Sequence, residues 1–216
     1  MVYLIGGPPR CGKTTLGDAL AKRMSVPYFT LDHVTSVISP YIPEQDYKTK
    51  LPLSIARQET NFSNDIFYSR YTPDQVVQFY LRQAETYWPG VESFIRYAIS
   101  DDHNLILEGW QILPRLLRAV VTRNNQLQTK AIFLYKLDEG SIVAGLKKRT
   151  ATQDWVLNNT KEENTFNAIA KMISQLGEYV EREARVCGFR SLNMDGEFTP
   201  KIREALDLAA ARDFNE

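Results

Sequence analysis

The sequence predicts an α/β protein in which a five-stranded parallel sheet lies between two layers of helices. Short apolar runs alternate with segments whose apolar residues recur every three or four positions, which is the pattern of strands separated by helices. Parallel strands need crossover connections, and these are usually helices on both faces of the sheet. The expected strands are residues 2–5, 27–30, 104–107, 131–135 and 189–193.

The expected helices follow from apolar periodicity and from residues that favour helix ends. Leu16, Leu20 and Met24 recur every four positions and predict a helix over residues 13–24. A long helix over about 161–186 ends before Gly188, because glycine suits the left-handed position after a helix. Its apolar stripe comprises Phe166, Ile169, Ile173, Leu176 and Val180. Shorter helices are expected at 113–122, at 138–149 and from Thr199-Pro200 onward.

A phosphate-binding motif follows the first expected strand. Residues 7–14 match G-x-x-x-x-G-K-[ST] in full. Such a loop points several backbone N–H groups into one hollow, and the next helix adds the positive end of its dipole. Lys13 can reach the β- and γ-phosphates, and the Thr14 hydroxyl can bind magnesium. The residues expected to bind ATP and Mg²⁺ are Gly7, Pro8, Pro9, Arg10, Cys11, Gly12, Lys13, Thr14 and Thr15.

The motif and the alternating elements together predict a three-layer α/β/α P-loop fold that forms one domain over residues 1–216. Residues 33–100 contain many aromatics, arginines and prolines but no long strand, so we expect a helical substrate-binding insertion there. Within it, Thr72-Pro73-Asp74 predicts a helix start, and a separate helix is expected from Pro89 to about Ser100. Residues 150–163 begin with an aperiodic segment and are expected to form a short lid-like loop.

Two carboxylates follow expected strands at the end of the sheet where parallel sheets hold ligands. Asp32 follows the second strand and Glu108 the third. A carboxylate near the γ-phosphate can orient an acceptor hydroxyl and take its proton, and the alternative for Asp32 is a helix cap. His33 adjoins Asp32 and is a candidate for the pocket wall, with a structural or surface role as the alternative.

The stretch GGPPRCGKTTL resembles the P-loop of small-molecule kinases related to nucleoside monophosphate kinases. Among these it looks most like kinases near 2-phosphoglycerate kinase and the zeta-toxin group. The resemblance implies that Asp32 faces the acceptor hydroxyl and that Glu108 supports magnesium through water. It also implies that the backbone at Asp195 and Gly196 borders the adenine, although an ordinary turn explains this pair equally well.

The same resemblance assigns two arginines. In LILEGWQILPR, Arg115 matches an arginine that grips acceptor phosphate, although it lies further from the glycine than in those kinases. Arg149 matches an arginine that covers the transferring phosphate, and the alternative is that it complements a helix dipole. Four arginines of the helical region are further candidates for an anionic acceptor, of which at most one or two are expected to enter the site: Arg57, Arg70, Arg82 and Arg96.

Composition limits the partners and the compartment. Lys plus Arg equals Asp plus Glu at 26 each, which argues against a general nucleic-acid binder. The two cysteines, Cys11 and Cys187, form no disulfide framework and predict a reducing, cytoplasmic location. For Cys11 we expect a small side chain tolerated in the loop, with a redox role as the alternative. No apolar run approaches the roughly 18 residues of a membrane span, and a monomer or homodimer is expected.

The leading functional prediction is an ATP-dependent kinase that transfers the γ-phosphate to a small hydroxyl-bearing metabolite. The first alternative is a nucleoside monophosphate kinase, but its acceptor is already ionised and needs no base such as Asp32. A nucleotide-hydrolysing regulatory switch is the second alternative, and the sequence lacks the N-K-x-D and LSGGQ-like patterns. A nucleotide-binding module without catalysis is disfavoured because Lys13 and Thr14 are both intact.

Overall fold

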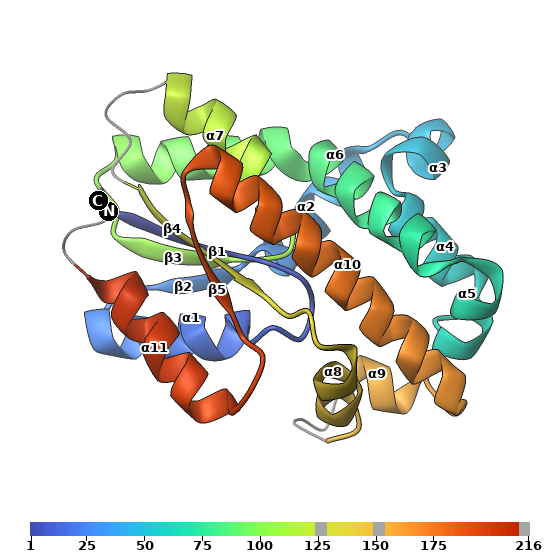
Figure 1. Ribbon diagram of the computed structural model, residues 1–216. Helices are drawn as coiled ribbons and strands as arrows, with labels where there is room; N and C mark the ends of the chain where they lie inside the picture. Colours follow the sequence, from blue (N-terminus) through green and yellow to red (C-terminus); the bar gives the residue numbers. More distant parts are fainter. Residues whose placement is uncertain (124–128, 149–153, 212–216) are drawn as a thin grey trace.

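The computed structural model describes residues 1–123, 129–148 and 154–211. Its described strands form one parallel sheet of five strands in the order β2-β3-β1-β4-β5 (Figure 1). The predicted fold class is therefore confirmed. The strands are β1 (Val2–Gly6), β2 (Tyr28–Thr30), β3 (Leu105–Glu108), β4 (Thr129–Tyr135) and β5 (Arg190–Asn193).

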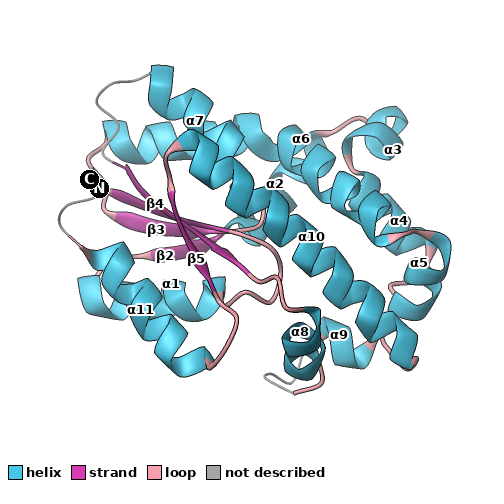
Figure 2. Ribbon diagram, viewed as in Figure 1, coloured by secondary structure: helices cyan, strands magenta, loops and turns pink. Residues whose placement is uncertain are grey.

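Helices cover both faces of the sheet (Figure 2). One face packs against α1 (Lys13–Met24) and α11 (Phe198–Ala210), and the other against α6 (Pro73–Ser100), α7 (Pro114–Arg123) and α10 (Glu163–Cys187). Side chains of a strand alternate between faces, so β1 contributes to two apolar clusters. Tyr3 and Ile5 join Leu16 of α1, whereas Val2 and Leu4 join residues of α7 and α10.

The region between β2 and β3 is helical, as predicted. Two 3-10 turns, Ser39–Tyr41 and Glu44–Asp46, separate the first of its helices from the others. Before α6 it contains α2 (Leu31–Ile38), α3 (Tyr47–Lys50), α4 (Pro52–Glu59) and α5 (Asn64–Arg70).

One prediction in this region is wrong. Pro89 does not begin a second helix, because α6 runs unbroken from Pro73 to Ser100 with Pro89 inside it. An interior proline costs about 3 kcal/mol. Tyr87, Trp88 and Val91 are buried on either side of it. Burial of each large apolar side chain stabilises by about 1.5–3 kcal/mol, which outweighs that cost.

The segment after β4 divides its helical residues differently from the prediction. Asp138 accepts a hydrogen bond from the backbone of Ser141 and caps α8 (Glu139–Leu146), which ends before the predicted residue 149. The aperiodic segment contains a short helix, α9 (Trp155–Asn158), because the Asp154 carboxylate caps it. Arg149 and residues 150–153 of the lid-like loop lie outside the described residues.

The last two helices agree closely with expectation. All five stripe residues of α10 are buried, and Gly188 ends the helix with a positive φ of 73°. Helix α11 begins at Phe198, so Thr199-Pro200 lies in its first turn rather than at its start. None of the helices in the described ranges is both long and apolar enough to span a bilayer.

The strand order explains where a binding groove can open. The chain leaves β1 for β2 on one side, but it leaves β4 for β5 on the other side. Loops that depart from neighbouring strands in opposite directions leave a crevice at the carboxyl ends of those strands. The phosphate-binding motif follows β1 directly and therefore lies at this crevice.

Candidate functional site

A large groove occupies the carboxyl end of the sheet. Its cavity volume is about 1890 Å³. A single small-ligand pocket usually measures roughly 300–1,000 Å³, so this groove has room for a nucleotide and a second molecule. Most of the predicted site residues line it together: Pro9, Arg10, Gly12, Lys13, Thr14, Thr15, Asp32 and Glu108.

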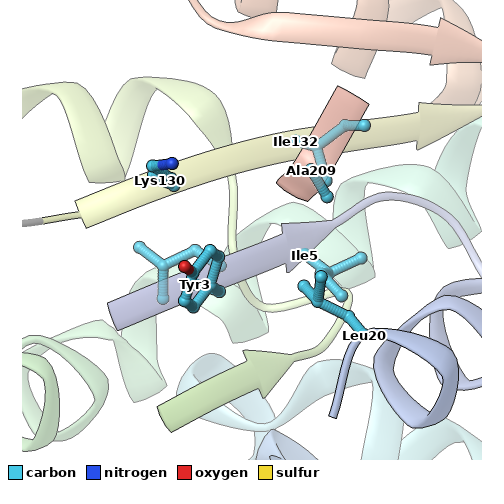
Figure 3. Close-up of a pocket in the computed structure, with 7 residues that line it drawn as sticks. Tyr3, Ile5, Leu20, Lys130, Ile132 and Ala209 are labelled. Carbon is cyan, nitrogen blue, oxygen red and sulfur yellow. The ribbon is translucent and has the colours of Figure 1, made fainter. Parts of the chain in front are cut away.

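A second hollow lies inside the molecule and is too small to bind anything. Figure 3 shows it between Tyr3 and Ile5 of β1 and Lys130 and Ile132 of β4, with Leu20 and Ala209 from the helices of that face. It contains no space that a water molecule could occupy. We therefore treat it as a packing gap of the core.

The P-loop backbone depends on two glycines with positive φ. A Cβ at Gly7, where φ is 134°, would lie 2.0 Å from the Leu134 carbonyl oxygen. A Cβ at Gly12, where φ is 90°, would lie 3.0 Å from the Phe198 ring. Lys13 is buried, and its Nζ donates a hydrogen bond to the Pro8 carbonyl oxygen at 2.8 Å. The Lys13 side chain thus folds back onto the P-loop backbone.

Cys11 is part of this loop but not of the groove surface. Its side chain is fully buried, and burial raises the pKa of its thiol to about 11. The thiolate is the reactive form of cysteine, so a raised pKa opposes a redox role. This burial agrees with the expectation of a small side chain tolerated in the loop.

Thr14 and Glu108 meet in the groove. The Thr14 hydroxyl donates to Oε1 of Glu108 at 3.2 Å, and the Tyr28 hydroxyl donates to the same oxygen at 3.1 Å. Burial and the Glu108 charge raise the pKa of Tyr28, which keeps its hydroxyl protonated as a donor. Hydroxyl and carboxylate oxygens are ligands that magnesium prefers, so this pair fits such an ion.

Asp32 lies in the first turn of α2. Thr30, not Asp32, is the N-cap residue, and its hydroxyl accepts from the Asp32 backbone N–H at 3.4 Å. The cap alternative for Asp32 is therefore wrong. Its carboxylate Oδ1 accepts a hydrogen bond from Nε2 of Gln111 at 3.0 Å. Gln111 lies in the turn after β3, and nothing in the local sequence marked it as a site residue.

The far wall of the groove contains Arg57 of α4. Its guanidinium lies 4.2 Å from the Phe67 ring centroid and 5.0 Å from that of Trp155, and it donates to the Asn64 side chain. Within the described ranges no carboxylate pairs with Arg57. Aromatic faces and an amide hold the cation in place without neutralising it. Arg57 is the one arginine of the four helical candidates that lines the groove.

Asn64 joins α5 to the α9 segment. It is fully buried, and its Nδ2 donates to the Trp155 carbonyl at 3.1 Å and to the Thr160 hydroxyl at 2.9 Å. Its backbone N–H donates to the Asn159 carbonyl at 2.8 Å. The wall of the groove around Arg57 is therefore built from two segments that are about ninety residues apart in the sequence, as the separation of Asn64 and Trp155 illustrates.

A buried ion pair connects the P-loop to the same α9 segment. Nη2 of Arg10 lies 3.1 Å from Oδ2 of Asp154, whose side chain is fully buried. Arg10 has a positive φ of 65°, a conformation that disfavours side chains with a Cβ. Its long side chain gives a reason for arginine at this position, because it reaches the Asp154 carboxylate.

Outside the P-loop, two predicted residues do not line the groove. Arg115 is exposed on α7 and pairs with Glu85 of α6 at 2.9 Å. His33 is exposed on α2 and is absent from the groove lining. Arg149 lies outside the described residues. Gly196 does line the groove, whereas the Asp195 side chain accepts from the N–H groups of residues 137 and 138.

Comparisons with known proteins agree with this fold. Residues 3–68 match a family model described as the ATPase family associated with various cellular activities (AAA). A mevalonate-3-phosphate 5-kinase from Thermoplasma acidophilum is 23% identical over 124 residues, which are 57% of this chain and 57% of that protein. A gluconokinase from Sinorhizobium meliloti has a TM-score of 0.53 at 12% identity, covering 97% of this chain and 91% of that one.

These matches agree with the motif and the fold. The chain has a P-loop motif within the part that matches the ATPase family model, and its five-stranded parallel sheet with flanking helices is also found in the gluconokinase. It spans somewhat more than half of the curated relative that it matches. The gluconokinase likeness, at 12% identity, establishes the fold alone.

Proposed function

We propose that this protein is an ATP-dependent phosphotransferase that moves the γ-phosphate onto the hydroxyl of a small acidic metabolite. One observation carries the proposal: the P-loop lysine, the Thr14–Glu108 pair and the Asp32 carboxylate line one groove. A nucleotide module without chemistry has no need of an additional carboxylate facing its phosphate-binding loop.

The nucleotide half would hold the triphosphate mainly through backbone. The loop amides and the N-terminus of α1 face the phosphates, and Lys13 exchanges its bond to the Pro8 carbonyl for phosphate oxygens. Magnesium, when bound with the nucleotide, supplies positive charge at the phosphates, and Thr14 and Glu108 are the residues that would hold it. The loop around Gly196, which leads to Phe198 against Gly12, is where the base of the nucleotide would lie.

Asp32 would act as general base on the acceptor. The acceptor oxygen forms a bond to the γ-phosphorus, the bond from that phosphorus to the β-phosphate oxygen breaks, and the hydroxyl proton passes to the Asp32 carboxylate. ADP leaves as the second product. This requirement for a base favours a hydroxyl acceptor over a nucleoside monophosphate.

Arg57 supports an acceptor with negative charge. Its guanidinium lines the groove and has no carboxylate partner within the described ranges. Planar guanidinium groups bind carboxylate and phosphate in a bidentate manner. The relative from Thermoplasma acidophilum acts, as its name states, on a phosphorylated compound, which agrees with this charge. A closer kinship to 2-phosphoglycerate kinases or zeta toxins, a cytoplasmic location and a monomeric or homodimeric state remain predictions from the sequence.

The test is an ADP-release assay with ATP, magnesium and matched pairs of acceptors. Each pair offers the same hydroxyl skeleton with and without a negative charge, for example glycerol against glycerate and glucose against gluconate, with nucleoside monophosphates as a separate pool. We expect strong stimulation by one acidic member and little by its neutral partner. Stimulation by nucleoside monophosphates alone would favour the first alternative. Turnover with water that no pool changes and that a partner protein switches on would favour the regulatory switch.

A further inference from the structure

We infer that Gln111 is a positioning residue, which holds the Asp32 carboxylate in the orientation needed to accept the proton. This inference rests on the proposed function. Gln111 lines the groove and is fully buried, and its Nε2 lies 3.0 Å from Oδ1 of Asp32. It reaches Asp32 from a different part of the chain, across 79 residues of sequence.

Asp32 needs such a partner because its surroundings do not fix it. The residue is exposed, in the first turn of a helix of eight residues. Within the described part of the chain, no other side chain hydrogen-bonds its carboxylate, so Oδ2 remains available to an acceptor hydroxyl. A general base must lie about 2.6–3.2 Å from the proton-bearing atom, and a misplacement of about 1 Å can cost roughly 100-fold in rate.

The glutamine side chain is otherwise poorly suited to its place. A carboxylate only accepts hydrogen bonds, so the amide nitrogen must face Asp32 and the amide oxygen must face away. That oxygen, Oε1, is buried and has no hydrogen-bond partner. An unsatisfied buried polar atom is unfavourable, whereas methionine would fill similar space without one. The contact with Asp32 therefore gives a reason for glutamine at this position.

The neighbouring backbone is adapted to the same contact. A Cβ at Gly109 would lie 2.3 Å from Oε1 of Gln111 and 2.8 Å from Cβ of Leu31. Leu31 directly precedes Asp32, so the bare backbone at Gly109 lets the β3–α7 turn approach the start of α2. Only a residue without a side chain permits this approach, which brings Gln111 to Asp32.

The chain contains a matched control for a buried amide. Gln175 on α10 also donates from Nε2 to an aspartate oxygen, Oδ1 of Asp74, at 2.9 Å. Its Oε1 is likewise buried without a partner, and Gln175 is absent from the groove lining. If any glutamine–aspartate pair of this kind acts only on stability, Gln111→Met and Gln175→Met will behave alike.

The kinetic test is a double-mutant cycle. Gln111→Met, Asp32→Asn and the double variant are assayed with the acceptor that gives the greatest stimulation, and with water alone. We expect Gln111→Met to lower kcat by about 10-fold to 100-fold with the KM for ATP unchanged. In the Asp32→Asn background the same substitution should change kcat less than about 2-fold, because a residue that acts through Asp32 has nothing left to orient. Gln175→Met should leave kcat at the wild-type value.

A second measurement detects the contact between Gln111 and Asp32 without enzymatic turnover. Carboxyl ¹³C NMR of aspartate-labelled protein follows Asp32, whose signal is identified by its loss in Asp32→Asn. Because Nε2 of Gln111 donates directly to Oδ1 of Asp32, Gln111→Met should change the chemical shift of the Asp32 carboxyl carbon at constant pH, whereas Gln175→Met should leave it unchanged.

The outcomes separate the inference from the function beneath it. An unchanged Asp32 carboxyl signal in Gln111→Met, or an equal loss of kcat in both backgrounds, overturns the positioning role even if the wild type is an active kinase. A wild type that transfers phosphate to no acceptor and not to water overturns the proposed function, and the positioning role falls with it. A changed Asp32 carboxyl signal together with non-additive kinetics supports both.

Discussion

The two halves of the groove are built by different means. The nucleotide half is mostly backbone from one continuous segment, in which glycines with positive φ shape the loop and α1 follows at once. The acceptor half is mostly side chains from segments that are far apart, with Arg57 and Asn64 from one region and Trp155 from another. The first half can be recognised from eight consecutive residues, and the second exists only after folding.

This difference separates triphosphate binding from acceptor selection in the proposed reaction. A backbone cradle accepts any triphosphate tail of the right shape, so it is compatible with many acceptors. Under the proposed function, the wall around Arg57 contains a cation that pairs with no carboxylate of the described ranges, so we expect it to select acceptors by charge. Variants of the nucleotide half should therefore affect every reaction, whereas variants of the acceptor half should affect acidic acceptors alone.

The largest effect is expected from a substitution in the nucleotide half of the groove. Lys13→Ala should lower phosphoryl transfer at least about 1,000-fold with every acceptor, because the lysine offsets charge on the transferring phosphate. The measurement is single-turnover transfer at saturating ATP. Lys22→Ala, in the last turn of the same helix, is the control and should keep wild-type rates. Equal rates in the two variants would remove Lys13 from the mechanism.

Asp32→Asn comes next and tests the boundary between the halves. We expect a loss of about 100-fold or more in kcat, since asparagine cannot take the hydroxyl proton, with ATP affinity unchanged. Calorimetric ATP titration and ADP release provide the two readings. Asp18→Asn, on the exposed side of α1, should change neither. Wild-type turnover in Asp32→Asn would contradict the assignment of a base.

Arg57→Gln probes the acceptor half alone. Loss of hydrogen bonds to a charged group costs about 1.5–3 kcal/mol, so KM for the acidic acceptor should rise roughly 10-fold to 100-fold. KM for ATP should stay constant. The surface arginine Arg82, which bonds the Thr49 carbonyl outside the groove, provides the control Arg82→Gln. An unchanged KM for the acidic acceptor would show that its charge is bound elsewhere.

Asn64→Leu tests whether the wall of the groove around Arg57 also contributes to the free energy of unfolding. The substitution leaves the Thr160 hydroxyl and two backbone groups of the α9 segment with fewer partners in a buried site. We expect the free energy of unfolding to fall by about 2–3 kcal/mol in a urea titration. Asn167→Leu, at an exposed position on α10, should change it by less than about 0.5 kcal/mol. Equal values for the two variants would mean that the Asn64 network contributes little.

The smallest expected effect concerns the P-loop thiol. Because burial raises the pKa of Cys11 to about 11, its thiolate stays scarce until the pH approaches that value. Iodoacetamide at pH 8 should therefore modify only the half-buried Cys187 in the folded protein and both cysteines in urea. Peptide mass spectrometry distinguishes the two sites. Rapid labelling of Cys11 at pH 8 would contradict its burial.

Local patterns predicted most of the fold and the nucleotide half of the site. The apolar runs of the strands depend only on residues that are close in the sequence. The same holds for the buried stripe of α10 and for its end at Gly188, so all of these could be predicted from the sequence. The predicted helix start at Pro89 was wrong because burial of the neighbouring side chains outweighed the cost of a proline inside a helix. Helix α9 was missed because one capping carboxylate, Asp154, determines it rather than a periodic pattern.

The acceptor half could be predicted only in part. Asp32, like Glu108 of the nucleotide half, was expected at the groove because each follows a strand, and the strands fix where such residues meet. Gln111, Trp155 and Asn64 depend on contacts across 79 to 91 residues, for which no local signal exists. Arg115 was assigned by resemblance although it lies further from Gly109 than in the related kinases, and its place on α7 directs it to Glu85 instead.

The turn after β3 has a practical meaning for redesign. Under the proposed function, four consecutive residues, 108–111, would provide a magnesium ligand, a bare backbone contact, a groove wall and the partner of the base. Inserting or deleting one residue there would displace all of these parts together. An engineer who wants a new acceptor should leave this turn alone and vary the surfaces of α4 and α5, where recognition can change while the catalytic distances stay fixed.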